Sequence, residues 1–400
     1  MPVSENARAA LSTSSLIRKM FEEGLALKKQ HGADKVFDFS LGNPDVEPPP
    51  EFKRVLSELA ADKTPGVHGY MPNAGLLDAR AAIAEKLSAE EGLKLGAENI
   101  VMSCGAAGAL NVVFKTILNP GDEVIVPSPY FVEYRVYAAN YGGILVGVPT
   151  KADFGLDVEA IRGALGPKTA AVLINSPNNP TGRLYSKEDI AALAGVLAES
   201  AAKDGRPPYL IADEPYRELV YDGKKAAPVL SSYKNTIIVN SWSKSLSLPG
   251  ERIGFIACSP ECDDLGELRG GLIWATRALG FVNAPAIMQR CVARLCGVTV
   301  NVEVYARRRA AFRSVLESAG LEYAPPEGAF YFFVKVPRGQ NGTNDDAEFS
   351  KRLKNELILG VSGGAFGAPG WIRFAYCVKE ELILASEGAF KRSLRAWNGL

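Results

Sequence analysis

The feature that most constrains the fold is a series of short, continuous apolar runs between residues 99 and 258, each followed by a helix-like stretch. Runs rich in valine and isoleucine are typical of strands that are buried on both faces. Strands that alternate with helices favour a mostly parallel sheet with helices on both sides. We therefore predict an α/β fold whose large domain holds a seven-stranded sheet, with strands at 99–103, 122–128, 143–148, 169–175, 208–213, 236–241 and 252–258.

The rest of the chain predicts a second, smaller α+β domain built from both ends of the sequence. Two strand-like segments lie near its C-terminal end, at 327–336 and 371–378, and helical patterns follow them. The expected division is an N-terminal arm with part of the small domain (1–48), the large domain (49–285), a long connecting helix (286–318) and the C-terminal small domain (319–400).

The composition excludes several kinds of partner. Lysine plus arginine and aspartate plus glutamate each number 45, so there is no basic excess of the kind that nucleic acids require. No apolar run is long enough to span a bilayer, and the N-terminus lacks the apolar core of a signal peptide, so we expect no membrane partner and a cytoplasmic location. With two histidines, six scattered cysteines and no C-x-x-C pair, no metal site is expected.

Polar or small residues directly follow several of the predicted strands. Gly105 begins a small-residue turn after the first strand, and Phe131 follows the second. Asn179, Asp213 and Lys244 follow three later strands. Because ligands of open α/β sheets bind just beyond the carboxyl ends of the strands, we expect these side chains to line one site.

Lys244 lies in a segment rich in hydroxyl groups, "NSWSKSLSLPGERIGF", at residues 240–255. A deprotonated lysine amine forms a Schiff base with carbonyl compounds. The residues around it are suited to a phosphate, which needs several hydrogen-bond donors and is bound well by helix N-termini and arginine. The expected phosphate donors are Ser241, Ser243, Arg252 and the turn of Gly105, Ala106 and Ala107.

The other strand-end residues are suited to an aromatic ring. Asp213 can accept a hydrogen bond from a protonated ring nitrogen, which contributes about 1.5–3 kcal/mol. Asn179 and Tyr216 can donate to a ring oxygen, and Phe131 can stack on the ring face. Pyridoxal 5′-phosphate is a phosphorylated aromatic aldehyde that needs all of these groups, and a Schiff-base lysine with an aspartate partner is its usual signature.

At these residues the chain resembles a known family, the class I/II aminotransferases of the aspartate aminotransferase kind, which are fold-type I pyridoxal phosphate enzymes. The resemblance extends from about residue 14 to 396. It depends on three specific motifs in the family's order and spacing, namely "NSPNNPTG" at 175–182, "DEPY" at 213–216 and "SWSKSLSLPGERIG" at 241–254.

The resemblance implies a role for each of these positions. Lys244 would be the Schiff-base lysine, with Asp213 and Tyr216 as further catalytic groups. Tyr70 matches a tyrosine that reaches the phosphate from the other subunit, which implies a homodimer with shared sites. The implied cofactor-binding residues are Gly105, Ala106, Ala107, Phe131, Asn179, Asp213, Tyr216, Ser241, Ser243, Lys244, Arg252 and Tyr70, and the implied substrate-binding residues are Gly42, Asn179 and Arg373.

Two positions, Ala107 and Arg277, bear on the substrate when the chain is compared with the family pattern. Some aspartate-specific members have a lysine at the position of Ala107 that binds the second carboxylate, and here the residue is alanine. Another subgroup uses an arginine from the neighbouring subunit, and Arg277 lies near that position. The segment "SGGAFG" at 362–367 also replaces the more usual Pro-Gly-Ser-Ala-Phe-Gly, and nothing in the sequence explains this change.

The expected reaction is transamination from an L-amino acid to a 2-oxo acid, with 2-oxoglutarate as the expected acceptor. Lys244 would remove the Cα proton and return it to the cofactor. A carbon–sulfur β-lyase or another enzyme of the same fold stays open, as does a non-enzymatic regulator that senses the cofactor. A serine hydrolase is not supported, since it would need one of only two histidines, and a nicotinamide-binding enzyme is not supported, since no G-x-G-x-x-G motif follows the first strand.

Overall fold

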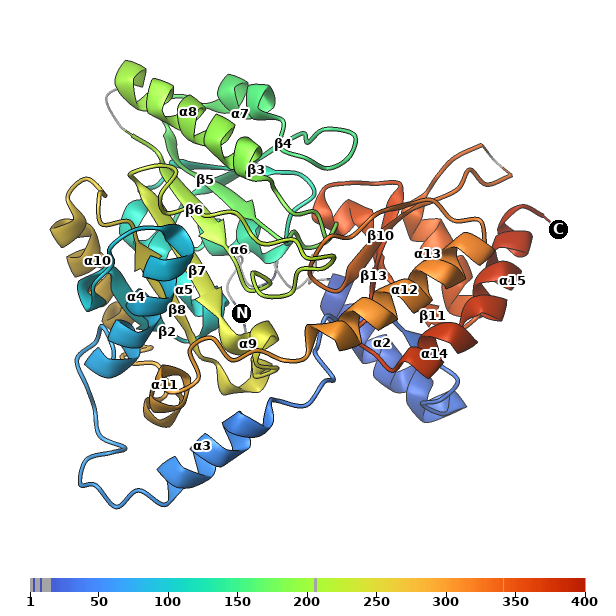
Figure 1. The fold of residues 1–400 in the computed structure, drawn as a ribbon. Coiled ribbons are helices and arrows are strands. Elements are labelled where there is room, and N and C mark those ends of the chain that lie inside the picture. Colours follow the sequence, from blue (N-terminus) through green and yellow to red (C-terminus); the bar gives the residue numbers. More distant parts are fainter. Residues whose placement is uncertain (1–2, 4–7, 9–15, 205–206, 341, 400) are drawn as a thin grey trace.

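The computed structural model describes residues 3, 8, 16–204, 207–340 and 342–399. Figure 1 shows a larger part, formed around one sheet, beside a smaller part that contains the C-terminal helices. The helix α2 (Leu16–His31) lies with the smaller part, beside helices from the C-terminal region of the chain. No helix among the described residues is long and apolar enough to cross a membrane.

The larger part contains the predicted seven-stranded sheet, in the order β2-β8-β7-β6-β5-β3-β4. Each predicted strand is present and differs by at most two residues at either end. The α/β fold class and the mostly parallel sheet are therefore confirmed. The strands are β2 (Ile100–Ser103), β3 (Glu123–Pro127), β4 (Ile144–Val148), β5 (Thr169–Asn175), β6 (Tyr209–Asp213), β7 (Thr236–Ser241) and β8 (Gly254–Cys258).

One strand, β8, runs antiparallel to both of its neighbours, β7 and β2. Only a short connection separates β7 from β8, and it contains the four-residue helix α9 (Trp242–Ser245). A parallel return usually needs a full crossover helix, whereas residues 242–253 form only α9 and a short 3-10 turn, so this connection suits an antiparallel return. As a result, Lys244 on α9 stays close to the sheet edge from which β7 emerges.

Alternate residues of the strands pack into two separate hydrophobic cores. In β5, Val172 and Ile174 face one core, whereas Ala171 and Leu173 face the other. This follows from the two-residue period of a strand. The first core includes residues from α3 (Pro50–Ala60), α4 (Leu77–Glu91), α7 (Val158–Ala164), α8 (Lys187–Asp204) and α11 (Ala286–Ala293), and the second from α5 (Gly105–Ile117), α6 (Glu133–Ala139) and α10 (Leu265–Ala278).

The smaller part has its own core, rich in aromatic residues such as Phe39, Phe312 and Phe374. Its sheet has the order β12-β13-β10-β9, and β1 pairs with β11 nearby. The parallel pairing of β1 with β11 brings a segment near residue 37 beside one near residue 358. The elements are β1 (Phe37–Asp38), β9 (Tyr323–Ala324), β10 (Tyr331–Lys335), β11 (Ile358–Leu359), β12 (Val361–Ser362), β13 (Trp371–Ala375), α12 (Val302–Ser318), α13 (Asp346–Asn355), α14 (Glu380–Ala385) and α15 (Glu387–Trp397).

The expected single connecting helix at 286–318 is wrong, because this segment forms two helices, α11 and α12. The helix α11 ends at Ala293, and Gly297, whose φ is +88°, lies in the turn that follows, where the chain changes direction. The chain then turns toward α9, where the Val300 N–H and the Thr299 hydroxyl both donate to the carbonyl of Ser245. This contact ties the start of the connection to the segment that carries Lys244.

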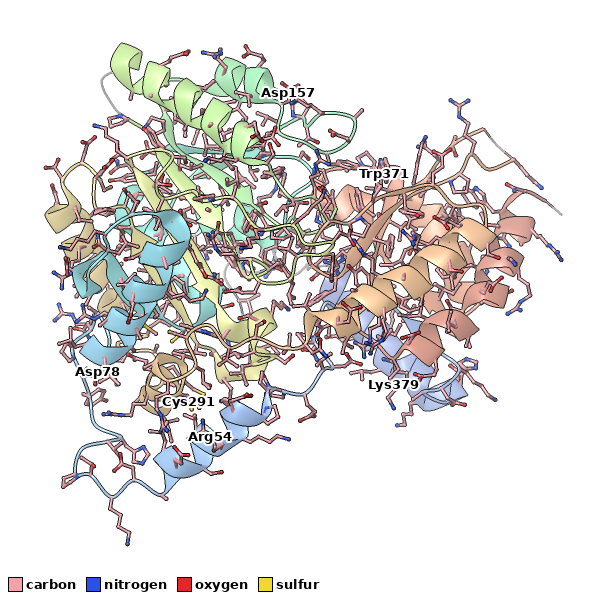
Figure 2. All side chains as sticks on the ribbon, viewed as in Figure 1. Arg54, Asp78, Asp157, Cys291, Trp371 and Lys379 are labelled. Atoms are coloured by element: carbon pink, nitrogen blue, oxygen red, sulfur yellow. The ribbon has the colours of Figure 1, made fainter. Side chains whose placement is uncertain are left out.

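Figure 2 shows that side chains fill the space between the sheet and its helices. Cys291 on α11 is buried in the first core, whereas Arg54 and Lys379 point outward from the periphery.

The start of β8 packs closely against the start of α5. A Cβ atom added at Gly254 would lie 2.5 Å from the Asn240 carbonyl oxygen and 2.9 Å from the Cα of Gly105. We therefore expect Gly254→Ala to lower the free energy of unfolding by about 1–3 kcal/mol, since the backbone has to shift. Gly250→Ala is the matched control, because no atom lies within 4 Å of its added Cβ. Equal urea midpoints for the two variants would contradict this account.

Candidate active site

A cavity of about 350 Å³ lies at the carboxyl ends of the central strands, between the two parts of the molecule. A wider groove of about 950 Å³ lies elsewhere, along α8 and Tyr233, and none of the sequence-predicted site residues lines it. The predicted residues that line the smaller cavity are Gly42, Ala106, Ala107, Phe131, Asn179, Asp213, Tyr216, Ser241, Ser243, Lys244, Arg252 and Arg373.

Lys244 extends from α9 into the cavity, and its Nζ atom donates a 2.7 Å hydrogen bond to the carbonyl of Gly42. The rings of Phe330 and Tyr216 lie beside the amine, with centroids 5.3 and 5.8 Å from Nζ. Burial lowers the pKa of the Lys244 amine to about 8, and the positive charges of nearby arginines act in the same direction. A substantial fraction of this amine is thus neutral near pH 8, the form that reacts with carbonyl groups.

Asp213 ends β6 at the floor of the cavity and is only 6% exposed. Its Oδ2 atom accepts a 2.5 Å hydrogen bond from the Tyr134 hydroxyl, but its Oδ1 atom is buried without a partner. Burial raises the pKa of this carboxyl to about 7, while the bond from Tyr134 acts against the rise. A buried, unpartnered carboxylate oxygen is costly, and a protonated ring nitrogen in the cavity would supply the missing donor.

The opposite end of the cavity is suited to an anion. Ser241 and Ser243 are buried there, and their hydroxyl oxygens lie 3.1 Å apart. Arg252 donates to the carbonyl of Pro249 and, within the described part of the chain, forms no ion pair with a carboxylate. A Cβ atom on Gly105, whose φ is +73°, would lie 3.0 Å from the Arg252 guanidinium, so the helix start and the arginine approach closely. The hydroxyls, the N-terminus of α5 and Arg252 fit a phosphate group.

Arg373, on β13, is 2% exposed and yet has no carboxylate partner among the described residues. Its guanidinium donates to the Asn179 Oδ1 atom at 3.0 Å and to the Ser40 carbonyl at 2.7 Å, while Nε has no partner. The rings of Tyr331 and Phe366 lie 4.7 and 4.9 Å from its Cζ atom. A buried arginine held only by neutral groups favours a carboxylate from a ligand.

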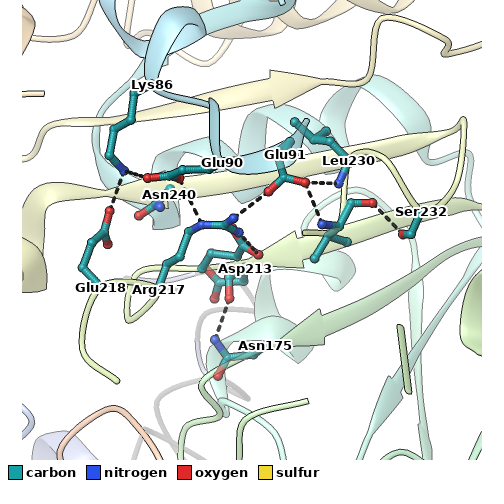
Figure 3. Close-up of polar contacts among 12 residues, drawn as sticks. Lys86, Glu90, Glu91, Asn175, Asp213, Arg217, Glu218, Leu230, Ser232 and Asn240 are labelled. Atoms are coloured by element: carbon teal, nitrogen blue, oxygen red, sulfur yellow. Dashed lines mark hydrogen bonds and ion pairs between the residues drawn. The ribbon is translucent and has the colours of Figure 1, made fainter. Parts of the chain in front are cut away.

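Behind Asp213, a network of buried charges holds the turn that follows β6 (Figure 3). Arg217 contacts Glu91 at 2.7 Å and Glu214 at 2.8 Å, and Glu91 also accepts hydrogen bonds from the N–H groups of Val229 and Leu230. Burial raises the pKa of Glu214 to about 7. The network fixes the Asp213–Arg217 turn to the end of α4, so the position of Asp213 depends on a distant helix.

Three of the predicted residues, Gly105, Tyr70 and Arg277, do not line this cavity. Gly105 lies beside the Arg252 guanidinium at its edge. Tyr70 is 95% exposed, and Arg277 is exposed at the end of α10. Phe131 lines the cavity, whereas the neighbouring Tyr130 is buried in the core, where its hydroxyl accepts a hydrogen bond from Arg135.

Three tyrosines that line the cavity, Tyr134, Tyr137 and Tyr331, are absent from the sequence prediction. Tyr134 lies three residues after Phe131, so a helical reading of this segment would have placed both near one face. Tyr331 comes from the smaller part, and no local pattern connects it to the strand ends.

An amine of lowered pKa, an unpartnered carboxylate oxygen and an anion site around one cavity define a pyridoxal phosphate enzyme built on an open α/β sheet. The family model described as "Aminotransferase class I and II" matches residues 34–385. The chain therefore belongs to the class I and II aminotransferases, which depend on pyridoxal phosphate.

Similar proteins agree with this family. A probable aspartate/prephenate aminotransferase of Aquifex aeolicus is 33% identical over 90% of this chain and 91% of its own length. An amino transferase of Eubacterium rectale has a solved structure that covers all of both chains, with a TM-score of 0.95 and 39% identity. The aspartate aminotransferase of Thermus thermophilus with maleate covers 98% of this chain and 100% of its own, with a TM-score of 0.86 and 30% identity.

The buried charge of Asp213 predicts a pH-dependent cost to the protein without cofactor. Because the folded-state pKa is raised, the ionised form destabilises the fold, and this cost grows between about pH 4 and pH 7. We expect Asp213→Asn to be more stable than the unsubstituted apoprotein by about 1–3 kcal/mol at pH 8, with a smaller difference at pH 5.

Urea denaturation of the apoproteins at both pH values measures this difference. Asp34→Asn is the control, since Asp34 is exposed and its removal should change little at either pH. A less stable Asp213→Asn apoprotein at pH 8 would contradict the assignment of an uncompensated charge.

Proposed function

We propose that this aminotransferase moves the amino group of an L-α-amino acid to a 2-oxo acid in the cavity between its two parts, with Lys244 as the proton-transferring base. The observation that carries the proposal is the convergence of Lys244, the unpartnered oxygen of Asp213 and the unpaired Arg373 on one cavity. The Lys244 amine lacks a carbonyl group to react with, the Asp213 oxygen lacks a hydrogen-bond donor, and Arg373 lacks a carboxylate. The cofactor or an amino acid would provide each of these partners.

The proposed cofactor contacts follow from the free polar atoms of the site. Asp213 accepts from the ring nitrogen and thereby keeps it protonated. Asn179 Nδ2 and the Tyr216 hydroxyl donate to the ring oxygen, since Arg373 already occupies Asn179 Oδ1. Phe131 packs against the ring. The phosphate is bound by Ser241, Ser243, Arg252 and the turn of Gly105, Ala106 and Ala107.

When bound, pyridoxal phosphate supplies an aldehyde that combines with amines and a ring that withdraws electrons from the amino acid's Cα. The protein supplies the proton transfers and orients the cofactor and the substrate. Lys244, whose pKa is near 8, takes the Cα proton and delivers it to the cofactor side as general base and then general acid. Asp213 holds the proton on the ring nitrogen, which favours this electron withdrawal.

We propose that Arg373, Asn179 and the backbone of Gly42 hold the α-carboxylate of the substrate. Arg373 presents a buried guanidinium that suits a carboxylate. The expected acceptor is 2-oxoglutarate, whose second carboxylate needs another cation. Ala107 offers none, so we assign that contact to Arg277 of the partner subunit. Relatives named for aspartate, and a solved relative with bound maleate, support an acidic substrate.

The proposed homodimer accounts for the position of Tyr70. This ring is 95% exposed in the single chain, and we propose that it reaches the phosphate in the other subunit's site. Leu77, which is 62% exposed, and Trp274, which is 49% exposed, are further large apolar side chains available for an interface. A monomeric mass in solution for the active enzyme would contradict this arrangement.

Lys244 gives the first test of the proposed function. Lys244→Ala is expected to abolish turnover while the cofactor still binds through its phosphate. In the unsubstituted apoprotein, the rate of cofactor capture should rise with pH and level off above about pH 8, because the neutral amine is the reactive form. Stopped-flow absorbance measures this rate. Lys379→Ala, at an exposed lysine, is the control, and full turnover by Lys244→Ala would refute the assignment.

Arg373 gives the second test. Arg373→Met should raise the KM for every amino donor about a hundredfold, because a buried, charge-assisted contact to the carboxylate is lost. Arg373→Lys keeps the charge but not the bidentate hydrogen-bonding geometry, so its KM should lie between those of the unsubstituted enzyme and Arg373→Met. Steady-state kinetics with the cofactor saturating measures both values. An unchanged KM in Arg373→Met would show that the carboxylate binds elsewhere.

A further inference from the structure

Tyr331, the first residue of β10, lines the cavity from the smaller part of the molecule and is only 2% exposed. It is not among the residues to which the sequence motifs point. Its side chain nevertheless contacts three of the groups to which the proposed function assigns a role.

The first contact is between two hydroxyl groups. The Tyr331 and Tyr216 oxygens lie 2.7 Å apart, and either can be the donor. The two rings meet edge to face, with centroids 5.7 Å apart. Because Tyr216 follows β6 of the larger part, this hydrogen bond joins the cofactor side of the cavity to the smaller part.

The other two contacts lie on the substrate side. The Tyr331 ring is 4.7 Å from the Cζ atom of Arg373, within the range of a cation–π interaction. The Tyr331 hydroxyl also packs against the backbone of Gly42, since a Cβ atom added there would lie 2.0 Å from the Tyr331 oxygen. The carbonyl of Gly42 accepts the hydrogen bond from Lys244. Glycine at position 42 thus leaves the space that the tyrosine hydroxyl occupies.

We propose that Tyr331 is a positioning residue with two separable tasks: its hydroxyl orients the Tyr216 hydroxyl toward the cofactor ring oxygen, and its ring supports the Arg373 guanidinium for the substrate carboxylate. The inference rests on the proposed function, since it requires the cofactor beside Tyr216 and the carboxylate at Arg373. The inference adds a residue that links the cofactor side of the cavity, at Tyr216, to the substrate side, at Arg373.

The chemistry of the hydroxyl pair fixes the direction of the effect. A phenol has one proton, so when Tyr216 donates to the ring oxygen, its own oxygen is left to accept from Tyr331. A donor that is itself hydrogen-bonded in this way is strengthened. Tyr331 therefore makes Tyr216 a better donor and favours the anionic form of the ring oxygen, which lowers the pKa that the absorbance of the bound cofactor reports.

The test is a pH titration of the visible absorbance of the holoenzyme. Tyr331→Phe keeps the ring and removes the hydroxyl, so the spectral pKa should rise by roughly 0.3–0.7 of a pH unit. Tyr376→Phe is the matched control, because Tyr376 is a fully buried tyrosine whose hydroxyl bonds to Tyr221 and the Ala329 carbonyl outside the cavity. An unchanged or lowered spectral pKa in Tyr331→Phe would overturn the role of the hydroxyl.

The task of the ring is tested by the donor KM. Tyr331→Leu removes the ring and should raise the KM about fivefold, whereas Tyr331→Phe should leave it nearly unchanged. Equal KM values in both variants would overturn the role of the ring. If the unsubstituted protein shows no titrating cofactor absorbance at all, the proposed function fails instead, so the two failures are distinguishable.

Discussion

The alignment of β5, β6 and β7 is the constraint on which the rest of the site depends. These strands are parallel neighbours, so their carboxyl ends meet at one edge of the sheet. Asp213 is the last residue of β6, and Asn179 and Lys244 follow the ends of β5 and β7 within four residues, so the three side chains line one cavity. Because these three strands are buried on both faces, a shift of one of them would disturb both cores as well as the site.

The cavity keeps charged groups buried without full compensation from the protein. Asp213 has an unpartnered oxygen, Arg373 has neutral partners only among the described residues, and burial lowers the pKa of Lys244. Such groups cost stability when the protein is empty, and a charged cofactor and substrate relieve this cost. The surrounding charges are instead well paired, as in the network of Arg217 with Glu91 and Glu214. The fold thus places unpaired charge where a ligand binds and paired charge directly behind it.

The sequence predicted the sheet well because continuous runs of valine and isoleucine are a local signal of doubly buried strands. It also predicted that Asn179, Asp213 and Lys244 line one cavity, since the carboxyl ends of parallel strands necessarily meet, whereas Gly42 and Arg373 were found only through the family resemblance. Other features depend on contacts between distant segments. Tyr331 approaches Tyr216 only after the smaller part folds against the larger one, and Arg217 finds Glu91 on a helix more than a hundred residues earlier. The turn between α11 and α12 includes a positive φ at Gly297 and the docking of Val300 against α9, and helical periodicity reveals neither of them.

The most direct test of the central claim is a half-reaction on the holoenzyme with single L-amino acids and no 2-oxo acid. Transamination at this cavity predicts loss of the yellow absorbance and release of one equivalent of 2-oxo acid per site, without free ammonia. The ranking of donors would also report the substrate class, and preference for aspartate or glutamate would support a role for Arg277. Continuous release of ammonia or pyruvate, with the absorbance retained, would contradict the account and indicate an elimination reaction instead.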